Sequence, residues 1–206
     1  MKNLLLNRSN YKRKNSYKKT VVAGVEKGVG ATHFSILLAN YYAEILGKKT
    51  AVIDLNKDND YAFLEEMCSS GNEHLTDVYK IKRVSYFSGV TKERMAEIFN
   101  RNYECIIIDV GENYEYFRNE ISMCDKKFMI GAINPWRLNN MLMLFKNGLL
   151  CSGSRWKYLY TFGDKESVNY VEESVKIKLH LVPNMPNPFR INTKQLAVFE
   201  KILWEE

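Results

Sequence analysis

A glycine-containing stretch at residues 24–33 carries the residue types that could hold a phosphate. It reads GVEKGVGATH, follows an apolar run and precedes a segment with helical spacing. Backbone N–H groups of such a loop, with the first turn of the helix after it, bind phosphate oxygens. The loop pattern G-x-x-x-x-G-K-[ST] is matched at Gly30 and Thr32, but Ala31 stands at the position of the lysine. The stretch therefore predicts a phosphate cradle without its principal cation.

Two further apolar runs end in acids. TAVIDL (50–55) contains Asp54, with Asn56 and Asp58 shortly after it, and ECIIIDVG (104–111) contains Asp109. An acid at the end of a buried strand positions Mg²⁺ in P-loop enzymes. Such an acid can equally accept hydrogen bonds from loop amides. Asp109 therefore has both a metal-binding and a purely structural interpretation.

Short β-rich runs alternate with helix-like segments from residue 20 onward. Strands are expected at 20–25, 50–55, 78–88, 104–111, 126–133, 156–162 and 178–184, and helices at 32–46, 61–67, 92–102, 136–147, 165–175 and 193–206. The alternation implies βαβ crossovers. We predict a doubly wound α/β fold, a P-loop NTPase-like and Rossmann-like three-layer domain whose mostly parallel sheet has helices on both faces. Ligands of such sheets bind at the carboxyl ends of the strands, where the glycine loop and both acids are expected.

Charge is unevenly distributed along the chain. The 206 residues carry a net charge of +6, and residues 1–19 contain seven Lys or Arg and no acid. The remainder is therefore close to neutral. We expect a basic, flexible N-terminal tail at 1–19 and one domain at 20–206. A tail of this kind can contact nucleic acid or an anionic membrane surface.

Composition excludes several other classes. No apolar run approaches the roughly 20 residues that a membrane span needs. The four cysteines lie far apart, which favours reduced thiols of a cytoplasmic protein over a disulfide framework. The three histidines form no ligand set with them, so a metal held by protein side chains alone is not expected.

These stretches, taken in order, resemble the ParA/MinD family of SIMIBI P-loop ATPases. The resemblance rests on EKGVGATHFSILLANYYAEILGKKTAVIDLN, NYECIIIDVG and CDKKFMIGAINPWRL, with LVPNMPNPFRI similar to the family's late strand and loop. It spans residues 20–203, and TadZ/CpaE-type pilus-assembly proteins are among the nearer-looking members. It implies ATP or ADP with Mg²⁺ as cofactor, a homodimer, and protein partners in a larger assembly.

The resemblance also assigns residues to the site. The nucleotide-contacting residues would be Glu26, Lys27, Gly28, Val29, Gly30, Ala31, Thr32 and His33. The residues that reach Mg²⁺ through the nucleotide would be Thr32, Asp54 and Asp109.

Departures from the family pattern weaken the expected catalysis. Ala31 replaces the lysine that reaches the β- and γ-phosphates, and Glu26 falls at the family's second, signature lysine. Asn56 stands where many relatives have an aspartate that orients water, and the base-contacting asparagine is not apparent in YTFGDKES (160–167). Lys27 and Asp58 are the remaining candidates for a catalytic role. The Walker A motif is thus degenerate.

Three states of the site stay open. Nucleotide binding with little or no turnover is favoured over a pseudo-ATPase without nucleotide, and both over hydrolysis through Lys27. The favoured function is a bacterial-type positioning or regulatory scaffold, for instance in pilus or secretion machinery, located in the cytoplasm or recruited to the inner face of the membrane. The alternatives are an active ParA-type ATPase that binds DNA non-specifically in partitioning, and a biosynthetic P-loop ligase.

Overall fold

One twisted sheet organises the chain. The computed structural model describes residues 19–56, 60–68, 78–146, 156–192 and 195–204. Within these residues the strands form an eight-stranded sheet in the order β3-β4-β2-β5-β1-β6-β7-β8. All neighbouring strands are parallel except β3 and β4. The strands are β1 (Lys19–Gly24), β2 (Thr50–Asp54), β3 (Tyr79–Ile81), β4 (Val84–Phe87), β5 (Cys105–Asp109), β6 (Lys126–Gly131), β7 (Trp156–Tyr160) and β8 (Leu179–Leu181).

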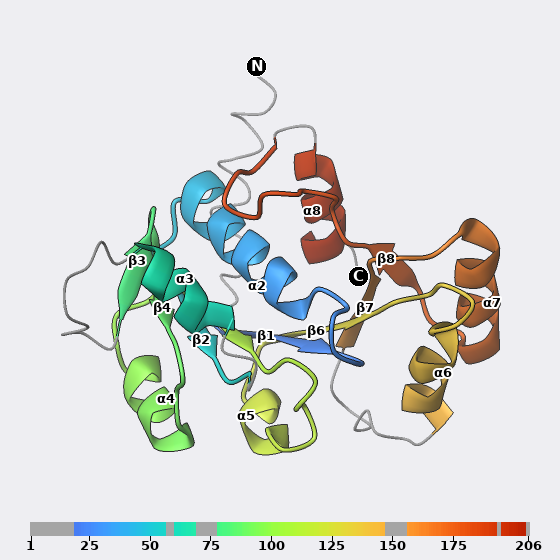
Figure 1. The fold of residues 1–206 in the computed structure, drawn as a ribbon, viewed down its shortest axis with the longest axis horizontal. Helices are drawn as coiled ribbons and strands as arrows, with labels where there is room; N and C mark the ends of the chain where they lie inside the picture. The colour runs from blue at the N-terminus through green and yellow to red at the C-terminus, as the bar shows by residue number, and fades with distance from the viewer. Residues whose placement is uncertain (1–18, 57–59, 69–77, 147–155, 193–194, 205–206) are drawn as a thin grey trace.

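Helices cover both faces of this sheet. The helices are α2 (Ala31–Asn40), continued by the π-helical turn η1 (Tyr41–Ile45), α3 (Asp60–Cys68), α4 (Lys92–Phe99), α5 (Arg118–Ser122), α6 (Leu138–Lys146), α7 (Lys165–Val175) and α8 (Leu196–Trp204). In Figure 1 α2, α3 and α8 lie above the sheet, and α4, α5 and α6 lie below it. The predicted three-layer, doubly wound α/β fold is confirmed.

Period-two alternation along the central strands builds two cores. Val22 of β1 packs on the α2 side, whereas its neighbours Val21 and Ala23 pack on the side of α4, α5 and α6. Every residue of β2 and β5 is buried, since helices cover both sides of the sheet. The central strands are thus fixed on two faces, and their carboxyl ends form a rigid platform.

Two elements differ from expectation. The stretch 78–88 is predicted to be a single strand, but it is a hairpin whose second strand, β4, is fully buried between β3 and β2. Lys82 makes the reversal by adopting a left-handed conformation with φ of 54°. The five-residue helix α5 was not predicted, because a single turn presents too few residues to show periodicity.

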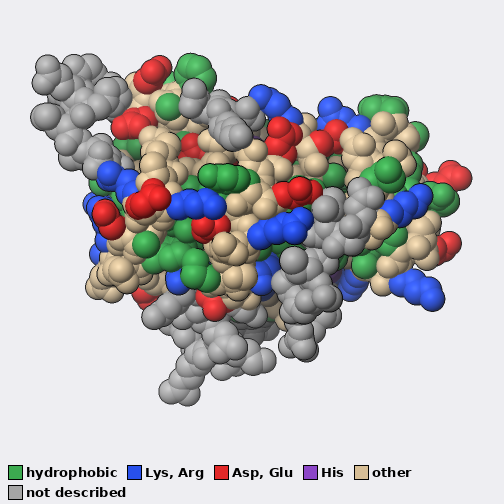
Figure 2. Space-filling model, turned by 90° about the horizontal axis from the view of Figure 1, so that it is seen from below, with side chains coloured by type: hydrophobic (Ala, Val, Ile, Leu, Met, Phe, Trp, Pro, Cys, Tyr) green, Lys and Arg blue, Asp and Glu red, His purple; other side chains and the backbone are tan. Residues whose placement is uncertain are grey.

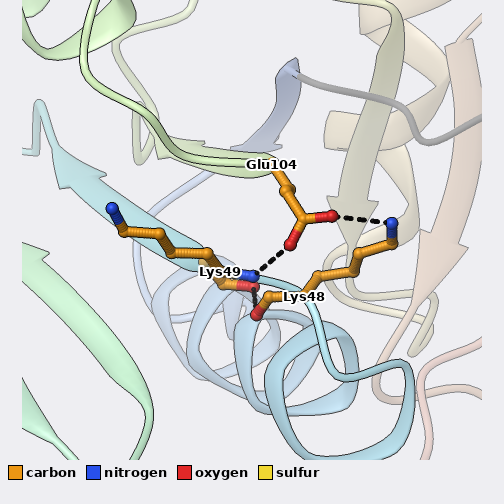
Figure 3. Close-up of polar contacts among 4 residues, drawn as sticks. Lys48, Lys49 and Glu104 are labelled. Atoms are coloured by element: carbon orange, nitrogen blue, oxygen red, sulfur yellow. Dashed lines mark hydrogen bonds and ion pairs between the residues drawn. The ribbon is translucent and has the colours of Figure 1, made fainter.

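Polar contacts fasten β2 to β5 at their amino ends (Figure 3). The Lys48 ammonium lies 2.9 Å from Glu104 Oε1, and the Lys49 backbone N–H donates to Glu104 Oε2 over 2.9 Å. The Thr50 hydroxyl donates to the Lys48 carbonyl oxygen. Glu104 thus sets the start of β2 beside the start of β5, at the edge of the sheet opposite the glycine loop.

The surface of the described residues shows no strong segregation of charge on the face in Figure 2. Basic and acidic side chains are interspersed there among apolar ones. None of the described helices is long and apolar enough to span a membrane.

The closing helix α8 is anchored by an aromatic stack. Phe199 is fully buried, with its ring stacked on Tyr41 at 4.8 Å and on Phe34 at 6.4 Å. This burial makes α8 part of the same core as α2.

Replacing Phe199 should therefore test how firmly α8 is held. Phe199→Ala is expected to lower the free energy of unfolding by about 3–5 kcal/mol, since a large buried side chain leaves a cavity. Urea denaturation measures the change. Phe63→Ala, at an exposed phenylalanine of α3, is the matched control and should leave the midpoint unchanged. A loss below about 1 kcal/mol for Phe199→Ala would contradict the anchoring.

Candidate functional site

The loop between β1 and α2 has the conformation of a phosphate cradle. Gly28 and Gly30 adopt left-handed backbones, with φ of 78° and 92°. A Cβ on Gly24 would lie 2.9 Å from Val29 Cγ2, so the loop folds back tightly over the end of β1. Helix α2 begins at Ala31, and its first hydrogen bond runs from the Phe34 N–H to the Gly30 carbonyl oxygen. The N–H groups of the preceding turn have no partner within the helix and can face an anion.

A cavity of about 410 Å³ lies over this loop. Its lining includes all eight residues predicted to contact nucleotide, Glu26 to His33, and Asn56. The remaining lining residues are Ile36, Asp60, Leu64, Gly111, Glu112 and Pro188. The fold thus gathers the whole predicted loop around one cavity.

Contacts from three other segments hold the glycine loop in place. The Thr161 hydroxyl, after β7, donates to the Val29 carbonyl oxygen over 3.0 Å. His33 Nε2 lies 2.9 Å from the Met185 carbonyl oxygen, beyond β8. The Gly111 carbonyl oxygen, after β5, accepts a hydrogen bond from the Gly24 N–H over 2.8 Å. These contacts join sequence-distant segments and were not predicted.

The acid at the place of the signature lysine is tied to α6. Glu26 Oε2 accepts a hydrogen bond from Asn140 Nδ2 at 2.8 Å, and Glu26 Oε1 lies 3.8 Å from Arg137 Nε. Arg137 is thereby engaged in local contacts, while its neighbour Trp136 is 79% exposed. Glu26 thus links the loop to the start of α6.

The two strand-end acids meet beneath the cavity without lining it. Asp54 and Asp109 are register partners on β2 and β5, and their side chains are almost fully buried. Asp54 Oδ1 accepts from the Asn56 N–H at 2.8 Å. Asp109 Oδ1 accepts from the Gly111 N–H at 3.0 Å, and its carboxylate also accepts from the Thr32 hydroxyl. Of the three residues predicted to contact the metal, Thr32 is therefore the one that also lines the cavity.

Tyr61 of α3 is a site residue that the sequence did not indicate. Its hydroxyl donates to Asp109 Oδ2 at 3.0 Å, and its side chain is fully buried. Its carbonyl oxygen accepts from the Tyr79 hydroxyl, which joins α3 to β3. The segment was expected to be helical, but nothing in its pattern indicated which residue would meet Asp109. Asp58, a candidate for catalysis, lies outside the described residues.

Burial governs the ionisation of Asp54, Asp109 and Tyr61. Burial, together with the charges of Asp109 and Asp60, raises the pKa of Asp54 to about 7, although hydrogen bonds from the Asn56 and Gly89 backbones lower it. Burial likewise raises the pKa of Asp109, although Gly111, Thr32 and Tyr61 donate to it. Burial and the two nearby acids raise the pKa of Tyr61, so its hydroxyl stays protonated and donates.

The donor set fits a phosphate better than it fits a protein-held cation. The cradle offers backbone N–H groups and Thr32, which suit phosphate oxygens. Mg²⁺ is usually held by one or two carboxylates together with phosphates and water, but Asp54 and Asp109 lie behind the cavity wall. Among the described residues no three His, Cys, Asp or Glu side chains gather as a metal site.

The fold and this loop together define a P-loop NTPase-like α/β protein. No protein-family model matches the chain, and no curated protein matches it in sequence. Solved structures do match its fold. A protein described as a plasmid partition protein of Borrelia burgdorferi B31, bound to AMPPNP, is 15% identical with a TM-score of 0.64 over 90% of this chain and 96% of its own.

Two further solved structures also match the fold of this chain. MinD in the MinC:MinD complex of Aquifex aeolicus is 17% identical with a TM-score of 0.60, over 89% of this chain and 85% of that one. A ParA family ATPase from Chlorobium tepidum TLS is 14% identical with a TM-score of 0.59, over 83% and 86%. The predicted ParA/MinD resemblance is confirmed at the level of the fold.

Protonation of Asp54 should make stability depend on pH. Because its pKa is raised in the folded state, the stabilisation that protonation gives is lost as pH rises toward and through about 7. The replaced side chain of Asp54→Asn cannot ionise. The difference in unfolding free energy, variant minus wild type, should therefore increase by about 2 kcal/mol between pH 5 and pH 8. Urea titrations in EDTA at both pH values measure this difference.

Glu173→Gln, at an exposed carboxylate of α7, is the control and should follow the wild-type pH profile. An Asp54→Asn variant with the wild-type pH dependence would show that Asp54 ionises in the fold without penalty.

Proposed function

We propose that the chain is a ParA/MinD-like nucleotide-binding module with weak or absent ATP hydrolysis. The observation that carries this is the cradle itself. Its glycines and Thr32 are in place around a cavity, while Ala31 begins α2 where a lysine would reach the β- and γ-phosphates. Phosphoryl transfer depends on such positive charge, whereas binding can draw on backbone N–H groups and the α2 dipole.

The charges around the cradle support the same proposal. Glu26 is held by Arg137 and Asn140, and Glu112 and Asp60 also line the cavity. Lys27 is the one Lys or Arg side chain among the described lining residues. Acids around a developing negative charge oppose hydrolysis. They oppose binding less when the ligand's charge is partly neutralised by its own cation.

The role we propose is that of a positioning or regulatory scaffold in a larger assembly, such as pilus or secretion machinery. A solved neighbour of the same fold, MinD, is a cell division protein seen in complex with MinC. In this role nucleotide occupancy would bias dimerisation and partner binding, and the substituted cradle suits occupancy without turnover.

Calorimetric titration of ATP and ADP with Mg²⁺ tests binding, and phosphate release tests turnover. The wild type should bind nucleotide and release no phosphate above background. Ala31→Lys should raise ATP affinity by about tenfold or more, since the new ammonium enters the cavity at the start of α2. Ala31→Met is the matched control of similar side-chain length, without charge, and should not raise it.

Two results would refute the proposal. Absence of binding at millimolar ATP and ADP would remove nucleotide as a ligand. Wild-type hydrolysis that Lys27→Ala abolishes would show a working catalytic site built on Lys27.

We further propose that residues 1–18 form a basic extension of the domain that binds an anionic polymer. Strand β1 begins at Lys19, so residues 1–17 can be removed without cutting the sheet. The full chain should bind a labelled DNA duplex with an affinity that falls steeply with salt, and the truncated chain should lose about tenfold or more. Fluorescence anisotropy measures both.

Replacing the five Lys and Arg residues from Lys2 to Lys14 with glutamine is the control. It should reproduce the truncation if charge is the cause. DNA binding that survives the truncation unchanged would refute the role of the tail.

A further inference from the structure

Thr161 holds the peptide that joins Val29 to Gly30. Its hydroxyl donates to the Val29 carbonyl oxygen over 3.0 Å. Thr161 directly follows β7, and its own N–H donates to the Gly131 carbonyl oxygen at the end of β6 over 3.2 Å. The sheet therefore sets the position of this hydroxyl, and the glycine loop is tied to a residue that lies outside it.

This contact fixes the direction of the Gly30 N–H. In a planar trans peptide the carbonyl and the N–H point in opposite directions, and the described part of the chain contains no cis peptide. Because the Val29 carbonyl oxygen is turned toward Thr161, the Gly30 N–H points to the other side of the loop. That is the side on which we place the cavity, because Val29 and Gly30 line it and Thr161 does not. No described residue accepts a hydrogen bond from the Gly30 N–H.

The glycine after this peptide makes its orientation depend on Thr161. Gly30 has φ of 92°, and a glycine has no Cβ to restrict rotation of the peptide before it. The Val29 side chain is buried, which fixes this residue but not the plane of the peptide that follows it. A Cβ at Gly30 would lie 3.4 Å from Thr161 Cγ2, so the threonine methyl lies against the Gly30 backbone. Thr161 thus selects one orientation through its hydroxyl and its methyl group.

We infer that Thr161 is a positioning residue for a phosphate group in the cavity: by holding the Val29 carbonyl oxygen, it directs the Gly30 N–H toward that phosphate. The inference rests on the proposed nucleotide binding. Ala31 brings no charge to the cavity, so the backbone N–H groups of the loop carry more of the phosphate contact. The direction of one such N–H then has a measurable effect on affinity.

Replacement of the Thr161 hydroxyl in the full chain tests this. Pyrophosphate and ADP, each with Mg²⁺, are titrated by calorimetry. Thr161→Val keeps the shape of the side chain and should lower both affinities about tenfold, because the Gly30 N–H is no longer held toward an anionic oxygen. Thr161→Ser keeps the hydroxyl and should bind both ligands within about twofold of the wild type.

The amide proton of Gly30 gives a direct readout of the same effect. Val29–Gly30 and Val110–Gly111 are the two Val-Gly pairs in the sequence, so isotope labels on valine carbonyls and glycine nitrogens select only these amides by NMR. Val110→Ile removes the second pair and so assigns the two signals. Pyrophosphate should move the Gly30 amide resonance downfield in the wild type and in Thr161→Ser, and by less than about half as much in Thr161→Val.

Thr50→Val is the matched control. The Thr50 hydroxyl also donates to a carbonyl oxygen over 3.0 Å, that of Lys48, but at the opposite edge of the sheet. Thr50→Val should leave both affinities and the Gly30 response unchanged. Thr161→Ala lacks the hydroxyl and is smaller, so it repeats the test without crowding the Val29 carbonyl. Unfolding temperatures of all variants separate loss of fold from loss of binding.

Three results would overturn the inference. If Thr161→Val and Thr161→Ala keep the wild-type pyrophosphate affinity, the hydroxyl does not orient the loop for phosphate. If they lose affinity while the Gly30 resonance responds as in the wild type, Thr161 does not act through this N–H. If Thr161→Ser loses as much affinity as Thr161→Val, the hydroxyl is not the cause.

Each of these results leaves the proposed function standing, provided that the wild type binds ADP. Absence of ADP binding to the wild type refutes the proposed function. Absence of pyrophosphate binding as well refutes this inference with it.

Discussion

Burial of β2 and β5 on both faces of the sheet is the constraint on which the site depends. Helix layers pack on each side of these strands, so Asp54 and Asp109 at their ends are held beside one another in an apolar setting. Their charges can be tolerated there only through donors from the surrounding loops. The Asn56, Gly111, Thr32 and Tyr61 contacts follow from that need.

The loop and the two acids, Asp54 and Asp109, therefore form two layers at the carboxyl edge of the sheet. The upper layer, from Glu26 to His33, lines the cavity and offers backbone N–H groups to a ligand. The lower layer, Asp54 and Asp109, is buried and does not line the cavity. Thr32, Asn56 and Gly111 belong to both layers, because they donate to these acids and also line the cavity.

Polar and charged contacts link the loop to the start of α6. Glu26 accepts a hydrogen bond from Asn140 and lies 3.8 Å from Arg137 Nε. Ala31 is the first residue of α2 and lines the cavity. The cradle keeps its shape because shape depends on Gly28, Gly30 and the contacts from Thr161 and Met185, none of which involves a lysine.

The sequence by itself determined the alternation of most strands and helices, the position of the loop and the presence of Ala31 within it. Those features are local: the apolar runs before Asp54 and Asp109 and the glycines before Thr32 are read within a few residues. Tertiary structure alone decided that 78–88 is a hairpin, that Glu26 meets Arg137, and that Tyr61 reaches Asp109 across 48 positions of the chain. Such pairings depend on how the helices pack on the sheet, and periodicity along one segment carries no information about them.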